Sequence, residues 1–163
     1  MQKNFIFSIL IIFIFFLVGF FLISQTNRIV RPANIKMVNL AGQNIIVDVA
    51  TEEDQHERGL SGRASLKENE GMLFVFAQPG KYPFWMKDMN FPIDIIWIAE
   101  DMKIIYIKKD VRPELYPESY GPANIPTQIG IPTEVGTKYV LEVVTGFSDK
   151  NNLKVGDRVE FTY

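Results

Sequence analysis

Three carboxylates have sequence surroundings in which they could do chemistry. Asp94 and Glu142 each interrupt an apolar run, and Asp88 lies in an aromatic segment shortly before Asp94. Two carboxyl groups whose environments hold their pKa values apart can act as general acid and base, as in the hydrolysis of a polysaccharide. A carboxylate inside an apolar run also suits a structural role, in an ion pair or held by hydrogen bonds, because a buried charge needs a partner. We favour the structural interpretation. The cations expected to pair with Asp94 are Arg58, Arg63 and Lys87.

Other catalytic chemistries find little support in the sequence. The chain has no Cys and a single His, His56, which rules out disulfides and thiolate metal sites and disfavours a zinc centre. Ser61 lies in no nucleophile elbow. Met72, Met86 and Met89 could bind a soft metal, but flexible Met side chains more commonly fill gaps in a core. We therefore expect neither a metal nor a cofactor.

An aromatic cluster around a Pro-Gly turn offers a second kind of site. Aromatic rings at the mouth of a sheet can form an apolar platform for a sugar ring or a peptide, with neighbouring polar side chains to orient it. Ordinary core packing would also account for the rings, since aromatic residues are common in β-sheet interiors. The cluster consists of Tyr82, Phe84, Trp85, Phe91 and Trp97. The candidate ligand-binding residues are Arg58, Arg63, Trp85, Lys87, Asp88 and Asp94.

The elements that would position these residues are mostly strands. Apolar runs of strand length, bounded by turn residues, predict strands over residues 35–40, 44–50, 71–76, 93–99, 102–108, 139–145 and 158–162. Residues 112–132 contain five prolines and predict a long loop. Many short strands with little helix indicate a mainly β fold, a compact β-sandwich or a partly closed barrel with one or two short helices.

Two short helical segments are expected among the strands. Thr51 followed by three acids predicts a helix with a hydroxyl N-cap, acidic residues against the positive end of the helix dipole, and an end near Gly59. Residues 148–152 could form a single helical turn. The acids at 52–54 point in successive directions on a helix, so capping explains them better than a calcium site does.

An uninterrupted apolar segment precedes the domain. Residues 5–23 carry no charge, and as a helix they would extend roughly 28 Å, close to the hydrocarbon thickness of a bilayer. We expect a transmembrane helix or uncleaved signal anchor at 5–23, after a short tail at 1–4 and before a linker at 24–34. Residues 35–163 then form a single domain. Cleavage of a signal peptide after about Ser24 is the alternative, although the apolar run is longer than such peptides usually have.

Charge bears on the location of the domain and on its partners. Three of the 17 basic residues precede Ile35 and all 19 acids follow it, so the domain carries 14 − 19 = −5, which argues against a nucleic-acid partner. Basic residues flank the apolar segment almost equally, so the positive-inside rule does not fix the orientation. The very short N-terminal tail favours an inside N-terminus, with the domain exported from the cell membrane. The sequence does not indicate an oligomeric state.

Several short motifs, taken in order, resemble those of a known family. They are Glu57–Arg63 (ERGLSGR), Gly71–Phe74 (GMLF), Phe84–Met89 (FWMKDM), Pro92–Asp94 (PID) and Val140–Val143 (VLEV). In this order they are similar to the DUF192 family of bacterial and archaeal proteins, and together they extend over almost the whole domain. The resemblance implies a compact β-rich domain, often exported, with no established reaction.

Three functions remain open at this point. The first is a membrane-tethered module that binds a small ligand, a glycan, a peptide or a protein partner of the cell envelope, through residues 85–94 and the turn of Arg58 and Arg63. The second is a hydrolase of an envelope polysaccharide that uses Asp88, Asp94 or Glu142. The third is a purely structural interaction domain. We rank the binding module first.

Overall fold

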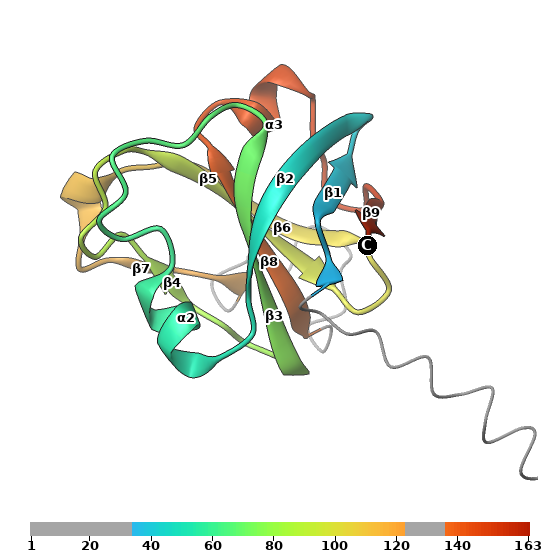
Figure 1. Ribbon diagram of the computed structural model, residues 1–163, viewed down its shortest axis with the longest axis horizontal. Helices are drawn as coiled ribbons and strands as arrows, with labels where there is room; N and C mark the ends of the chain where they lie inside the picture. The colour runs from blue at the N-terminus through green and yellow to red at the C-terminus, as the bar shows by residue number, and fades with distance from the viewer. Residues whose placement is uncertain (1–33, 123–135) are drawn as a thin grey trace, which may run out of the picture. The chain divides into compact units, whose positions relative to one another are not determined.

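A curled seven-stranded sheet is the framework of the computed structural model, which describes residues 34–122 and 136–163. The strand order is β6-β5-β8-β3-β2-β1-β9, and Figure 1 shows how the sheet curls. Every neighbouring pair is antiparallel except β2 and β3, which run parallel. The strands are β1 (Met37–Leu40), β2 (Gln43–Ala50), β3 (Glu70–Gly80), β5 (Ile93–Ala99), β6 (Ile104–Val111), β8 (Thr137–Val144) and β9 (Val159–Thr162).

The two edges of this sheet approach each other and partly close a barrel. Lys103, just before β6, forms an isolated antiparallel bridge with Arg158, just before β9. The backbone N–H of Val159 donates to the carbonyl of Met102 at 2.9 Å, and that of Ile104 donates to the carbonyl of Asp157 at 2.9 Å. Of the two predicted architectures, the partly closed barrel is therefore the one observed.

All seven strands predicted from apolar runs are present, six of them with shifted ends. The run at 93–99 coincides with β5, whereas β3 extends to Gly80 through an irregular register after Val75. Two strands were not predicted: β4 (Phe84–Trp85) and β7 (Ser119–Tyr120) form a small separate sheet. A two-residue strand is too short to show any periodicity in the sequence.

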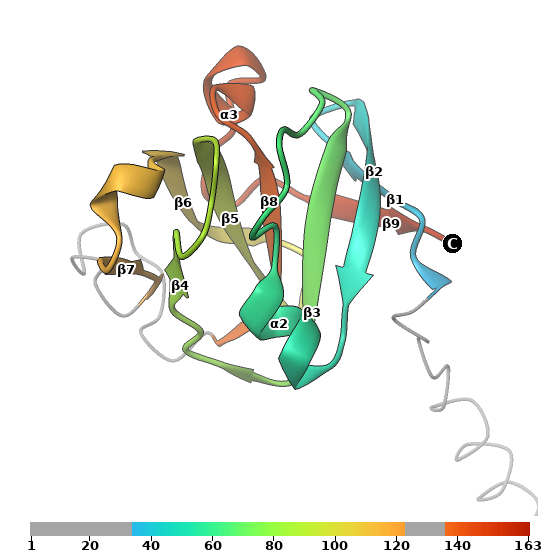
Figure 2. The same ribbon diagram turned by 60° about the vertical axis from the view of Figure 1, so that its left-hand side comes forward.

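The two predicted helical segments also form, with one correction. Helix α2 (Glu53–Arg58) has Glu52 as its N-cap rather than Thr51, and it ends at Gly59, which has φ +50°. The side-chain oxygen of Gln55 accepts the backbone N–H of Thr51 at 2.8 Å and that of Glu52 at 3.1 Å. Helix α3 (Phe147–Lys150) and a 3₁₀ turn, η2 (Pro113–Leu115), complete the described elements. Figures 1 and 2 place α2 and α3 at opposite ends of the sheet.

Apolar side chains pack on both faces of the sheet. One cluster draws on nearly every strand and fills the barrel; it includes Leu40, Leu73, Ile96, Ile98 and Leu141. The other lies on the outer face, under the segments that carry α2, β4 and β7; it includes Phe74, Phe84, Ile95, Trp97 and Val140. All seven residues of β5 are buried as a result. This explains why its sequence is apolar on both alternating sides.

The membrane helix predicted over residues 5–23 lies outside the described residues. Among residues 34–122 and 136–163, no helix is both long and apolar enough to cross a membrane.

Candidate functional site

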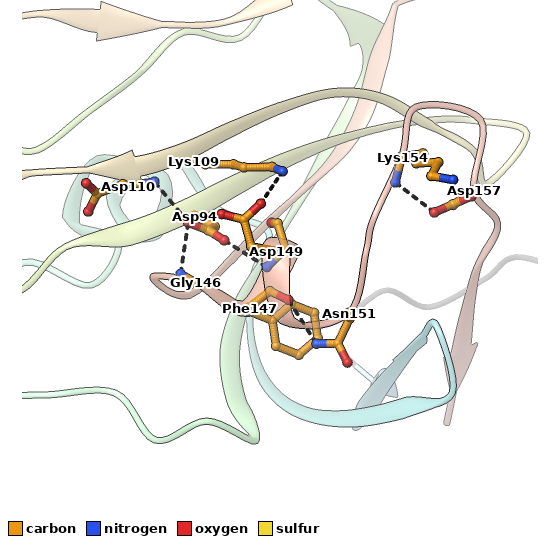
Figure 3. Close-up of polar contacts among 10 residues, drawn as sticks. Asp94, Lys109, Asp110, Gly146, Phe147, Asp149, Asn151, Lys154 and Asp157 are labelled. Atoms are coloured by element: carbon orange, nitrogen blue, oxygen red, sulfur yellow. Dashed lines mark hydrogen bonds and ion pairs between the residues drawn. The ribbon is translucent and has the colours of Figure 1, made fainter.

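Asp94 is fully buried, and hydrogen bonds to its carboxylate link three segments of the chain: β5, the end of β6 and the start of α3 (Figure 3). One carboxylate oxygen accepts the backbone N–H groups of Asp110 at 3.0 Å and Gly146 at 3.3 Å. The other accepts the backbone N–H of Ser148 at 2.9 Å, in the first turn of α3. The carboxylate therefore joins β5 to the end of β6 and caps α3, because the N–H groups at a helix start lack partners within the helix.

The structure corrects the predicted partners of Asp94. We favoured an ion pair with Arg58, Arg63 or Lys87, but the carboxylate is instead held by hydrogen bonds from three backbone amides, which was the alternative. Several N–H donors can compensate for the burial of a carboxylate, so no cation is required. With both of its oxygens in use inside the core, Asp94 has a structural role in this geometry.

Glu142 is also buried, with 4% of its surface exposed, but its environment differs from that of Asp94. It lies between Met72 and Ile95 on the neighbouring strands, and its Oε2 atom has no hydrogen-bond partner among the described residues. Burial raises the pKa of Glu142 to about 8, and the positive charge of Arg63 opposes this only in part. At neutral pH Glu142 is therefore mostly a neutral carboxylic acid.

Two loops that contain the predicted site residues dock on each other. The hydroxyl of Ser61 donates to the carbonyl of Lys87 at 2.8 Å, and the N–H of Gly62 donates to the carbonyl of Asp88 at 2.8 Å. The amide of Asn90 donates to the carbonyl of Arg63 at 2.8 Å. Asp88 has φ +54°, a conformation that Asp and Asn tolerate better than most residues do. The backbone of these motifs thus holds the two loops together.

The charged side chains of these loops point mostly to solvent. Arg63 pairs with Asp48 at 2.6 Å, and both side chains are substantially exposed. Arg58, Lys87 and Asp88 are exposed, and none of the three is in an ion pair among the described residues.

The three candidate catalytic carboxylates do not assemble into one open site. Side chains alternate along a strand, and Ile93 and Ile95 belong to the outer cluster, so Asp94 faces the other side of the sheet. Val140 belongs to the outer cluster, so Glu142 faces outward with it. Asp94 and Glu142 therefore project from opposite faces and cannot work as an acid–base pair. Asp88 is exposed on a loop.

Trp85 is the candidate residue that lies at an open pocket. Trp85 is 41% exposed, and it borders a pocket of about 250 Å³ between α2 and β4. His56 packs against Phe76 with ring centroids 4.7 Å apart, and its Nε2 atom is 3.1 Å from the carbonyl oxygen of Ala50. The pocket is lined by Glu53, His56, Glu57, Phe76, Pro83, Phe84 and Trp85.

Most residues of this pocket were not predicted from the sequence as site residues. Helix α2 contributes Glu53, His56 and Glu57 to the pocket, whereas the acids at 52–54 had been interpreted as capping residues. The spacing of these three residues could have indicated a shared surface, since positions i, i+3 and i+4 lie on one side of a helix. Two other described pockets, one beside Phe147 and one beside Tyr120, contain none of the candidate catalytic or ligand-binding residues, although Tyr82 of the predicted aromatic cluster lines the second.

Comparison with known proteins identifies one family. The model of the DUF192 family, described as "Uncharacterized ACR", matches residues 36–161. A crystal structure of a Sinorhizobium meliloti protein, named as a candidate transcription regulator, is similar at 26% identity with a TM-score of 0.65 and covers 77% of this chain and 90% of that one. A Novosphingobium aromaticivorans protein of unknown function is similar at 26% identity with a TM-score of 0.64, over 77% of this chain and 84% of that one. No curated protein matches the chain.

Replacing Asp94 by Asn should destabilise the domain. An amide nitrogen would face a backbone N–H where a carboxylate oxygen now accepts it, and leaving a buried donor unsatisfied costs roughly 1–3 kcal/mol. Denaturant unfolding followed by circular dichroism would measure the loss. Asp149→Asn, at an exposed residue of α3 paired with Lys109, is the matched control and should change stability by less than about 1 kcal/mol. Equal stability of the two variants would contradict the role of Asp94.

Glu142 should make stability fall as pH rises. The folded pKa of about 8 lies above the unfolded value of 4.5, so between these values the folded state holds a proton that the unfolded state has released. The free energy of unfolding should therefore decrease from pH 4.5 to about 8 and then level off. Glu142→Gln should remove this slope and stabilise the protein at pH 8 by on the order of 2–4 kcal/mol.

The measurement is chemical denaturation of both proteins at several pH values. Glu142→Met tests the same idea without a buried amide, and Glu160→Gln, at an exposed position in β9, is the control that should keep the wild-type slope. Parallel pH profiles for wild type and both Glu142 variants would show that Glu142 does not carry the effect.

Proposed function

The chain belongs to the DUF192 family, and from this premise we propose that its domain is a membrane-tethered binding module of the cell envelope, with its ligand site at the pocket beside Trp85. The ligand is a small molecule or a short segment of a partner. The apolar segment at 5–23 supports the tether, because its length suits a bilayer.

The observation that carries this proposal is the exposure of Trp85 at a pocket. A Trp side chain has a large apolar surface, and Trp is over-represented among the residues that dominate binding energy. The neighbouring Phe84 is buried in the outer cluster, which fixes the strand that carries Trp85. An anchored aromatic ring beside a concave surface is the arrangement expected of a preformed ligand site.

The other functions have weaker support. A carboxylate hydrolase needs two acids at one open cleft, and Asp94 and Glu142 are buried on opposite faces of the sheet. The regulator name of the Sinorhizobium meliloti protein suggests a nucleic-acid partner. The acidic balance of the domain, 14 basic against 19 acidic residues from Ile35 onward, disfavours such a partner here.

A thermal-shift screen of the full chain tests the binding function. A panel of envelope glycan fragments, peptides and small metabolites should contain compounds that raise the melting temperature, since a ligand at 100 times its Kd stabilises a protein by about 2.7 kcal/mol. Trp85→Ala should abolish that shift. Tyr163→Ala removes another exposed aromatic side chain and should keep it. A panel without any Trp85-dependent shift would refute the binding site.

Tethering and export need a separate test. Protease added to intact spheroplasts should degrade a tag on the C-terminus, and the tagged protein should fractionate with membranes. Removal of residues 1–24 should release the domain into the soluble fraction. Full protection of the tag in intact spheroplasts, with digestion only after lysis, would refute the exported orientation.

A further inference from the structure

We propose that the pocket beside Trp85 is selective for an organic cation, an alkylammonium or guanidinium group. This inference rests on the proposed function and narrows its ligand class. The group could belong to a free amine or to a lysine or arginine side chain, and the chemistry of recognition is the same for both.

The walls of the pocket are largely aromatic. Trp85, Phe84, Phe76 and His56 all line it, and Phe84 and Phe76 are held in place by further ring contacts. Phe84 packs edge-to-face on Phe74 with centroids 4.8 Å apart, and Phe76 stacks on Tyr82 at 3.5 Å. The face of an aromatic ring attracts a cation, most strongly for Trp, and rigid rings lose little entropy on binding.

Acidic side chains, but no Lys or Arg, line the pocket. These acids are Glu53 and Glu57. They are four residues apart on α2, which places them on the same side of the helix. Both are exposed, and neither is in an ion pair among the described residues. A cation in the pocket would therefore meet two free carboxylates, whereas an anion would be repelled.

The position of Glu57 is not explained by helix stability. Glu53 begins α2, where a negative charge complements the positive end of the helix dipole. Glu57 is the penultimate residue of the same helix, where the dipole is negative and an acid is unfavourable. A ligand cation held between Glu57 and the ring of Trp85 would compensate for this.

The size of the pocket limits what enters it. About 250 Å³ lies below the range of roughly 300–1,000 Å³ that is typical of pockets for drug-sized ligands. The pocket thus suits one head group, with the rest of the ligand outside. A neutral sugar ring could stack on Trp85 and donate its hydroxyls to the carboxylates, but it would leave their two negative charges uncompensated.

Paired cationic and neutral probes test this selectivity on the full chain in a maltoside detergent, which carries no ammonium group. Choline is compared with its neutral isostere 3,3-dimethylbutan-1-ol, and N-acetyl-lysine methylamide with the methylamide of N-acetyl-2-aminoheptanoic acid, whose pentyl side chain is its neutral isostere. Kd values come from tryptophan fluorescence and from the shift of the Trp85 indole N–H in NMR spectra. Each cation should bind at least about tenfold more tightly than its isostere. The two pairs distinguish a free amine from a lysine side chain.

Variants assign the effect to the pocket. Trp85→Ala should weaken binding of both cations about tenfold, and Trp85→Phe should weaken it less. Glu53→Gln with Glu57→Gln should weaken the cations and leave the neutral isosteres unchanged. Glu114→Gln with Glu160→Gln makes the same change in net charge away from the pocket and should have no effect.

The outcomes separate this inference from the proposed function. If the neutral isosteres bind as tightly as the cations and Trp85→Ala weakens both, cation selectivity is refuted and the binding site stands. If cations bind but neither Trp85→Ala nor the double glutamine variant weakens them, the pocket is refuted as their site. If no cation binds while the thermal-shift panel yields a Trp85-dependent ligand, only the cation inference fails.

Discussion

The burial of both faces of the central strands is the constraint on which the rest of this structure depends. Each residue of β5 is buried: Ile93, Ile95, Trp97 and Ala99 belong to the outer cluster, and Ile96 and Ile98 belong to the cluster inside the barrel. A sheet of this kind needs a second apolar layer on its outer face. The segments that carry α2 and β4 provide this layer with Leu60, Phe84 and Met86. These segments are therefore part of the folding core, and the surface residues that they carry have fixed positions.

The same constraint explains why two carboxylates on adjacent strands behave differently. A charge in such a sheet must find donors or lose its charge. Asp94 lies near the strand start, where the β8–α3 turn and the end of β6 bring three N–H groups to it. Glu142 lies under the cover between apolar neighbours, where no described donor reaches Oε2 and the pKa rises. Burial is common to both carboxyl groups, and the local backbone decides which of them finds hydrogen-bond donors.

The sequence predicted the strands, which depend on hydrophobic periodicity, but not the side-chain partners, which depend on tertiary contacts. The seven strands of the main sheet follow from apolar runs and turn residues, which left the sandwich and the partly closed barrel both open, and the burial of Asp94 follows from its neighbours. Its partners do not, because backbone amides carry no sequence signal and Gly146 and Asp110 are far from Asp94 along the chain. Helix α2 was predicted from its capping residues. Its role as a wall of the pocket depends on Trp85, which the sequence does not place opposite it.

The exposure of Trp85 follows from the packing of its neighbour. In β4, side chains alternate between the core and the surface, and Phe84 is held inward by edge-to-face contacts with Phe74 and Trp97 at 4.8 and 5.8 Å. A shift of β4 by one residue would bury Trp85 and expose Phe84, and it would break these contacts. The core thus holds the indole at the surface next to α2. A large ring held at a pocket in this way is preorganised, so little conformational entropy is lost in ordering it when a ligand binds.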